Sequence, residues 1–268
     1  MSSLEPICLI TGASAGIGAE LARVFASHGH RLALTARRLP ELNALADEIA
    51  ATGQPRPHVI ATDLGDPQGP DQLQQSLIAA GLEPSIVVNN AGFGLLGEAA
   101  ALDRDRQLAM IDLNTRALTD LSLRFLDSVT RHRGGILNVA SVAGYVPGPG
   151  MAVYHATKAY VLSFSEALHE ELKADGVRVM ALCPGPVPTE FFARAGMPAS
   201  YIPAMLTRGA GRVAREAYDG FVGQHRVVAP GTLNRLATLL PRLLPRGWIL
   251  AGMARHWARH GNASRPKG

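Results

Sequence analysis

Short apolar segments alternate with longer amphipathic segments along most of this chain. Residues 7–11 are almost entirely apolar, a glycine-rich turn follows them, and apolar positions then recur at helical spacing through residues 19–26. A short apolar run bounded by turn residues predicts a buried strand, and the helical spacing predicts a helix packed against it. The same reasoning predicts five further strands, at residues 31–35, 58–61, 86–88, 135–140 and 177–182.

The alternation continues from residue 7 to about residue 229 and predicts an α/β fold, with a parallel sheet covered by helices on both faces. The chain has 268 residues, 47% of them hydrophobic, which is enough for one substantial core. We therefore predict a single domain over residues 1–230, with residues 231–268 as an extension. The loops that follow the strands then share one edge of the sheet, where ligands bind in such folds. Residues 190–210 are predicted to be irregular and to form an apolar lid at that edge.

The turn after the first predicted strand carries glycine at positions 12, 16 and 18. Side chains at these positions would keep the backbone away from a pyrophosphate, and the first turn of the following helix offers free N–H groups to such an anion. A lone glycine-rich loop is more often an ordinary turn. Its place between a buried strand and an amphipathic helix predicts a nucleotide site.

The end of the second predicted strand indicates which nucleotide is bound. A carboxylate there would bind the ribose 2′-hydroxyl of NAD, but the strand runs instead into Arg37 and Arg38. Two guanidinium groups suit the 2′-phosphate of NADP through forked hydrogen bonds. We therefore favour NADP(H), held by these two arginines alone because Ala15 in the glycine loop is uncharged. The alternative is a pair of solvated loop arginines and an NAD(H) site.

Tyr154 and Lys158 are four residues apart, which on a helix places both side chains on one face. A free tyrosine titrates near pH ~10, and a neighbouring ammonium lowers that pKa by favouring the phenolate. Lowering the pKa by about 3 units takes roughly 4 kcal/mol. One close cation in a water-poor cleft supplies much of this energy, and a second cation would complete it. The pair is thus a candidate proton-transfer site, although such pairs also occur by chance on solvated helices.

Together these motifs resemble the short-chain dehydrogenase/reductase family, in its short single-domain branch. The resemblance covers roughly residues 5–230 and implies a Rossmann-type, doubly wound, three-layer α/β fold. It also implies a nicotinamide cofactor and hydride transfer between that cofactor and a carbonyl or secondary alcohol. The matching motifs, in the order and at the intervals typical of the family, are residues 11–18, Asp63-Leu64, residues 89–92, Asn114, Ser141, Tyr154 with Lys158, and residues 184–189.

The resemblance implies four catalytic residues. Tyr154 would donate the proton and Ser141 would hold the substrate oxygen against it. Lys158 would lower the pKa of Tyr154 and bind the nicotinamide ribose, and the oxidised ring would be the second cation. Asn114 would hold a water that links Lys158 to solvent. Taken singly, Ser141 could be an ordinary turn residue and Asn114 a hydrogen-bonded buried amide.

The cofactor contacts come from the loops after the predicted strands. Asp63 would contact the adenine amino group, or serve only as a helix cap. Val187 and Thr189 would lie against the nicotinamide carboxamide. The predicted cofactor-binding residues are Gly12, Ser14, Gly16, Ile17, Gly18, Arg37, Arg38, Asp63, Leu64, Asn90, Ala91, Gly92, Tyr154, Lys158, Pro184, Gly185, Val187 and Thr189.

We predict an NADP(H)-dependent oxidoreductase that acts on a small-molecule carbonyl. The apolar residues of the predicted lid favour a hydrophobic substrate such as a ketoacyl chain, a steroid-like ketone or an aldehyde; they are Phe191, Phe192, Met197, Tyr201, Ile202 and Met205. One alternative is an NAD(H)-linked alcohol dehydrogenase on the same fold. Another is a dinucleotide-sensing protein without turnover, against which the complete set of four catalytic residues argues. The helices around residues 104–130 and 151–174 resemble the subunit contacts of the family and predict a homodimer or homotetramer.

The charge of the chain is unevenly distributed. The formal net charge is +4, but residues 220–268 contain eight Lys or Arg and no Asp or Glu, so the first 219 residues carry −4. This basic segment also contains Trp248, Trp257 and several leucines, and Pro241 and Pro245 are predicted to interrupt it. Its apolar runs are too short to span a bilayer. Three interpretations stay open: packing on the core or on a partner subunit, peripheral docking of residues 232–260 on anionic lipid, and recognition of an acidic carrier such as an acyl thioester.

Other site classes find little support in the sequence. His256 and His260 are four residues apart without a third ligand nearby, so we predict no metal site. No basic recognition helix with interleaved aromatic residues indicates nucleic-acid binding. Cys8 and Cys183 are predicted to be buried free thiols, and the first strand begins too early for a signal peptide. We therefore expect a cytoplasmic protein, with a membrane-peripheral location as the alternative.

Overall fold

Seven parallel strands form the central sheet, in the order β3-β2-β1-β4-β5-β6-β7. The structure is a computed structural model that describes residues 4–197 and 204–260. The chain order reverses between β1 and β4, as in a doubly wound Rossmann-type sheet. The strands are β1 (Glu5–Thr11), β2 (Leu32–Ala36), β3 (His58–Ala61), β4 (Leu82–Asn89), β5 (Gly135–Val139), β6 (Arg178–Leu182) and β7 (Val227–Val228).

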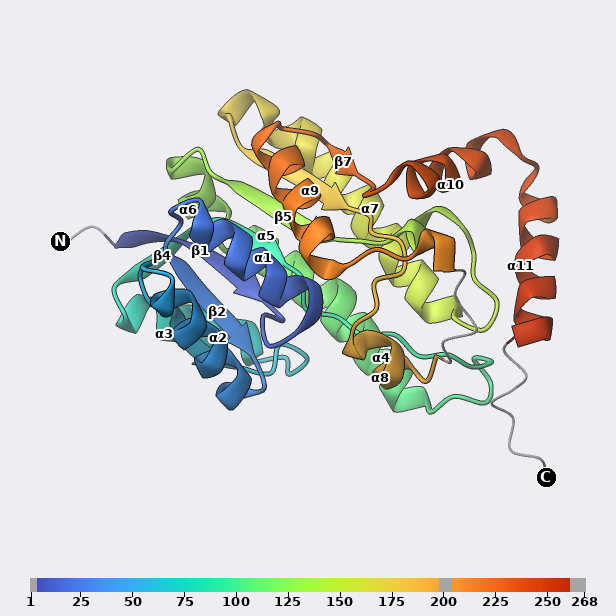
Figure 1. Cartoon of the computed structure of the whole chain (residues 1–268), viewed down its shortest axis with the longest axis horizontal. Coiled ribbons are helices and arrows are strands. Elements are labelled where there is room, and N and C mark those ends of the chain that lie inside the picture. Colours follow the sequence, from blue (N-terminus) through green and yellow to red (C-terminus); the bar gives the residue numbers. More distant parts are fainter. Residues whose placement is uncertain (1–3, 198–203, 261–268) are drawn as a thin grey trace.

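Helices cover both faces of this sheet and make three layers (Figure 1). Leu9 and Ile10 are neighbours in β1 but project into opposite cores, because successive side chains of a strand point to opposite faces. The Ile10 side is covered by α1 (Gly16–Ser27), α2 (Leu39–Ala51) and α9 (Ala210–Val222). The Leu9 side is covered by α3 (Gly69–Ala79), α5 (Leu118–Arg124), α6 (Leu126–Arg131) and α7 (Ala152–Leu172). The predicted fold class is thereby confirmed.

The six predicted strands are all present, with ends that differ by a few residues. β4 begins earlier than predicted because residues 82–85 include Glu83 and Pro84, which hide the apolar pattern. Pro84 lacks an N–H donor, and it pairs with Ile7 where the register between β1 and β4 shifts. β7 was not predicted, since a strand of two residues leaves no measurable periodicity.

The segment 190–210 is not irregular throughout, which corrects the prediction. Residues Glu190–Ala195 form α8 and Ala204–Leu206 form a short 3-10 turn. The hydroxyl of Thr189 accepts a hydrogen bond from the backbone N–H of Phe191 and caps α8, and Gly196 ends it with a φ of 71°. Tyr201 and Ile202, which the sequence placed in the lid, lie outside the described residues.

The C-terminal extension forms two helices, α10 (Thr232–Leu243) and α11 (Arg246–His260). Pro245 separates them as predicted, but Pro241 lies inside α10, so the predicted break at that residue is wrong. A proline so near the helix end removes one backbone hydrogen bond and does not end the helix. Figure 1 shows both helices, in red, at the end of the molecule away from α2 and α3. None of the helices in residues 4–197 and 204–260 is long and apolar enough to cross a membrane.

Candidate active site

A cavity of about 1480 Å³ opens at the carboxyl edge of the sheet. Its wall comes from the loops after six strands, as expected where parallel strands end together. The structure describes all of the predicted site residues, and of these only Gly18 and Asn114 do not line the cavity. The topology therefore gathers into one cavity residues that are up to 177 positions apart in the chain, from Gly12 to Thr189.

The glycine loop is shaped for close approach of an anion. Gly12 and Gly16 have φ angles of 65° and 59°, in the left-handed region that favours glycine. Within the described residues, no side chain caps the start of α1 at Ala15 and no acidic residue lies in its first turn. The backbone N–H groups there are thus open to a pyrophosphate, so the loop fits a dinucleotide.

Gly18 has a packing function instead of a place in the cavity wall. A Cβ at Gly18 would overlap the carbonyl oxygen of Gly12 and the side chain of Asn90. The Asn90 amide donates to the carbonyl oxygens of Thr11 (2.9 Å) and Gly12 (3.1 Å). It thereby joins the end of β4 to the glycine loop, and Ala91 and Gly92 continue from it along the cavity wall.

Arg37 and Arg38 both line the cavity next to the glycine loop. Arg38 Nη2 donates to Ser14 Oγ at 3.1 Å, and the guanidinium also forms ion pairs of 3.1 Å with Glu41 and with Glu190. Arg37 is more exposed, and its Nη1 is 3.8 Å from Asp63 Oδ2. The two guanidiniums therefore form a cationic corner beside the loop, in which Arg38 has three side-chain partners and Arg37 is the more exposed.

Asp63 is not a helix cap. Its Oδ1 accepts a hydrogen bond of 2.9 Å from the backbone N–H of Gly65, whereas α3 begins only at Gly69. The carboxylate thus stabilises a tight turn after β3. Asp63 and Leu64 both line the cavity at this point.

Tyr154 and Lys158 lie on α7, and both line the cavity. Lys158 Nζ is 5.9 Å from the centre of the Tyr154 ring and donates a hydrogen bond of 2.7 Å to the carbonyl oxygen of Val139. Ser141 follows β5, and its Oγ accepts from the backbone N–H of Ala143 at 3.1 Å. The catalytic candidates from β5 and α7 therefore meet across one space.

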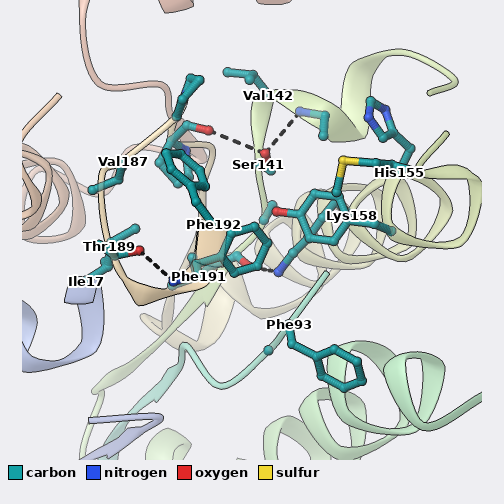
Figure 2. Close-up of a pocket in the computed structure, with 18 of the residues that line it drawn as sticks. Ile17, Phe93, Ser141, Val142, His155, Lys158, Val187, Thr189, Phe191 and Phe192 are labelled. Atoms are coloured by element: carbon teal, nitrogen blue, oxygen red, sulfur yellow. Dashed lines mark hydrogen bonds between the residues drawn. The ribbon is translucent and has the colours of Figure 1, made fainter. Parts of the chain in front are cut away.

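Aromatic side chains line this space next to Tyr154. The ring centres of Tyr154 and Phe191 are 5.5 Å apart, and Phe192 follows at 6.2 Å from Phe191. Figure 2 shows Phe191 and Phe192 beside Ser141 and Lys158, with Ile17, Val187 and Thr189 toward the glycine loop. The reacting groups are thus held in apolar surroundings.

The pKa of Tyr154 differs from the sequence prediction. Burial raises this pKa to about 12, and a hydrogen bond with Ser141 opposes the rise. The neighbouring Lys158 does not offset this rise in the protein alone, and burial lowers the pKa of Lys158 itself to about 8. The expectation of a lowered phenol pKa is therefore wrong for the protein alone. At neutral pH the phenol keeps its proton and the lysine is mostly charged.

Asn114 lies behind the cavity wall in a π-helical turn, Asp112–Ala117, between α4 (Arg104–Ile111) and α5. Its Nδ2 donates to the carbonyl oxygen of Phe93 (2.9 Å) and to Thr157 Oγ1 (3.2 Å), and its Oδ1 accepts from the N–H of Phe93 (3.1 Å). The side chain is a hydrogen-bonded buried amide that joins the loop after β4 to α7. The water relay through Asn114 stays a prediction.

The C-terminal extension supplies part of the cavity wall, which the sequence reasoning missed. Its cavity-lining side chains are mostly apolar and include Leu240, Leu244, Trp248, Met253 and His256. The apolar residues of this segment were a usable signal, but their pattern does not say which surface the segment packs against.

Two glycines fit the extension onto the body of the domain. A Cβ at Gly185 would overlap Asn234 of α10, and a Cβ at Gly150 would overlap the Trp257 ring of α11. Gly185 belongs to the loop after β6, and Gly150 lies just before α7. The extension is therefore seated on the two loops that border Ser141 and Tyr154.

The buried ammonium of Lys158 predicts a pH dependence of stability. Its pKa is about 8 in the folded protein against an ordinary 10.5, so between these values the unfolded chain binds a proton that the folded chain lacks. The free energy of unfolding then rises with pH across this window, by up to ~1.36 kcal/mol per pH unit. The free energy of unfolding of the wild type and of Lys158→Met can be measured with denaturant at several pH values. From about pH 7 to about pH 10, the wild type should gain about 2 kcal/mol relative to the variant. Parallel pH profiles would contradict this result.

Comparison with known proteins agrees with this geometry. The short chain dehydrogenase family model matches residues 6–198. The chain is 39% identical to a sulfoacetaldehyde reductase from Chromohalobacter salexigens over 185 residues, which are 68% of this chain and 72% of that protein.

Two similar solved structures extend over the C-terminal helices as well. A short-chain dehydrogenase from Sphingobium yanoikuyae in complex with NADPH is 30% identical, with a TM-score of 0.77 over 98% of this chain and 97% of that one. A bulky-bulky ketone specific alcohol dehydrogenase from Comamonas testosteroni is 27% identical, with a TM-score of 0.73 over 100% of this chain and 97% of that one.

These matches confirm the family resemblance drawn from the motifs and decide against a dinucleotide sensor without turnover. The protein belongs to the short-chain dehydrogenase family and is an oxidoreductase that acts on CH–OH groups of small molecules with a nicotinamide dinucleotide.

Proposed function

We propose that this protein transfers hydride between NADP(H) and a bulky hydrophobic carbonyl compound or its secondary alcohol. The observation that carries the cofactor preference is the cationic corner of Arg37 and Arg38, held beside the glycine loop by the bond from Arg38 to Ser14. The NADPH complex of the similar Sphingobium protein supports the same preference.

The nicotinamide would supply the hydride and, when oxidised, a positive charge next to the tyrosine. Tyr154 holds the proton that the developing alkoxide takes up, and its raised pKa keeps that proton in place at neutral pH. Ser141, which is hydrogen-bonded with Tyr154, orients the carbonyl oxygen. Lys158 binds the nicotinamide ribose and stabilises the phenolate that proton transfer leaves behind. Asn114 completes a water relay that returns a proton to Tyr154.

The cavity wall supports a hydrophobic substrate. It contains Phe191 and Phe192 near Tyr154, and it also contains the side chains of Leu240 and Trp248. Such a wall binds apolar bodies, with Ser141 and Tyr154 as the polar groups that orient the carbonyl. The bulky-ketone specificity of the similar Comamonas protein agrees with this substrate class.

Arginine substitutions test the cofactor preference. We expect Arg37→Ala and Arg38→Ala each to weaken NADPH binding by roughly 10-fold to 100-fold, because each removes charged hydrogen bonds to the 2′-phosphate. NADH binding should change little. Titration of both cofactors by fluorescence measures this, with Arg56→Ala as the matched control, since Arg56 lies in the loop after α2 and pairs with Asp47. Equal losses for NADPH and NADH would refute a 2′-phosphate site.

We also propose self-association through the helices that the sequence indicated. Large apolar side chains on these helices are exposed: Leu108 and Ile111 on α4, Leu123 on α5 and Tyr160 on α7. None of them belongs to the C-terminal extension, and a homodimer or homotetramer formed through these helices would bury them.

A further inference from the structure

Helix α10 is packed with its polar side inward and its apolar side outward. Asn234 and Thr238 are only 3% and 8% exposed, and Asn234 Nδ2 donates to the carbonyl oxygen of Pro230 at 2.8 Å. The leucines on the opposite side are exposed; they are Leu233 (49%), Leu236 (52%), Leu239 (49%), Leu240 (55%) and Leu243 (81%). An amphipathic helix of a water-facing surface has the reverse orientation. An exposed leucine surface of this extent marks an interaction site.

The exposed leucine face continues into the active-site cavity. Leu240, Leu244 and Trp248 line the cavity, and yet 55%, 39% and 71% of their surface is exposed. Leu236 and Leu243 belong to the same face but do not line the cavity. One apolar surface therefore runs from the outside of α10, over its end, to the cavity mouth.

The charged residues of the C-terminal extension have one sign. Residues 231–260 contain five arginines and no acidic residue. Leucine and tryptophan on one side of a helix, with arginine in the flanking positions, are typical of helices that lie in the surface of an anionic bilayer. The arginines would then bind lipid headgroups while the leucines enter the acyl region.

We propose that α10 and the start of α11 dock on the surface of an anionic lipid bilayer, with the leucine face of α10 inserted. Because that face borders the cavity mouth, an apolar substrate can pass from the bilayer into the cavity. This second step rests on the proposed function, whereas the docking does not.

A second copy of the chain fits this surface less well. Two-fold pairing of the extension would bring two basic segments of the same charge together, and like charges repel. The exposed apolar side chains of α4, α5 and α7 offer a separate surface for self-association. The arginine-rich extension is complementary in charge to an anionic surface and not to the same extension of a second copy.

Vesicle co-sedimentation tests the docking without any substrate. The full chain should bind vesicles of phosphatidylglycerol and phosphatidylcholine, bind pure phosphatidylcholine more weakly, and lose affinity as salt is raised. A double variant, Leu236→Gln with Leu243→Gln, should bind roughly 10-fold or more weakly because it removes inserted apolar area. The matched control is Leu39→Gln with Ile78→Gln, on exposed sites of α2 and α3 at the far end of the molecule (Figure 1).

Several outcomes would overturn the docking proposal. These are an intact protein that binds neither vesicle, a double variant that binds as tightly as wild type, and a double variant that changes only the oligomeric state measured by light scattering. Circular dichroism confirms that the variants are folded. In a separate assay, the double variant should lose activity on a long-chain ketone held in vesicles but keep activity on a short soluble ketone. Failure of both activities in the wild type would count against the proposed function and leave the vesicle-binding result standing.

Discussion

Replacing Tyr154 by phenylalanine is expected to lower kcat by roughly 10³-fold, because positioned proton donors contribute about 10²-fold to 10⁴-fold. The phenol of Tyr154 on α7 is hydrogen-bonded with Ser141, and desolvation keeps it protonated with a pKa of about 12. Phenylalanine preserves the ring and its contact with Phe191, so the cavity should keep its shape. The loss should therefore appear in kcat, with cofactor affinity unchanged.

The measurement is NADPH consumption on a panel of ketones and aldehydes of graded size, together with cofactor titration. Tyr160→Phe is the matched control. Tyr160 lies on the same helix, and its hydroxyl is hydrogen-bonded with Thr119 Oγ1 outside the cavity wall. A Tyr154→Phe variant with turnover near that of the control would refute the catalytic assignment.

Replacing Lys158 by methionine is expected to have the next largest effect, a loss of roughly 10²-fold in kcat. Lys158 Nζ is the cation near the Tyr154 ring, at 5.9 Å from its centre, and α7 and β5 hold it through the bond to Val139. Without the ammonium, the phenolate formed by proton transfer loses its neighbouring positive charge in apolar surroundings.

The pH dependence of alcohol oxidation separates this electrostatic role from a purely structural one. Oxidation needs the deprotonated tyrosine, so its rising limb should move to higher pH in Lys158→Met, whereas a structural defect would lower the rate at all pH values alike. Lys173→Met, at an exposed lysine after α7, is the matched control. An unshifted pH profile in Lys158→Met would contradict the proposed role.

Periodicity along the chain was sufficient to predict the sheet. The alternation of short apolar runs and helical spacing specified six of seven strands, because strand and helix burial impose different repeats on the residues. Parallel strands then force their loops to one edge, so Gly12, Asp63, Ser141 and Thr189 could be grouped in one site without coordinates. The motifs and their order were sufficient to identify the family.

The tertiary structure alone decided the electrostatics of that site. The i, i+4 spacing on α7 indicated that Tyr154 and Lys158 share a face, but not that Lys158 is buried and Tyr154 partly buried. Burial depends on what packs around a group, here Phe191 and the strands beneath, and it raises the pKa of the phenol where the sequence favoured a lowered one. The sequence also did not show how Asn114 is held. Its side chain is hydrogen-bonded to Phe93 and Thr157, which are distant in the chain and meet it only in the folded protein.

The orientation of the C-terminal helices was likewise outside the reach of the sequence. Local pattern determined that residues 232–260 are amphipathic and basic, and it left open what they contact. Only the fold seats Asn234 on Gly185 and Trp257 on Gly150, which turns the leucines of α10 outward and completes the cavity wall. A helix carries its two faces in its own sequence, but which face is buried depends on the partner surface, and that surface is assembled from distant segments.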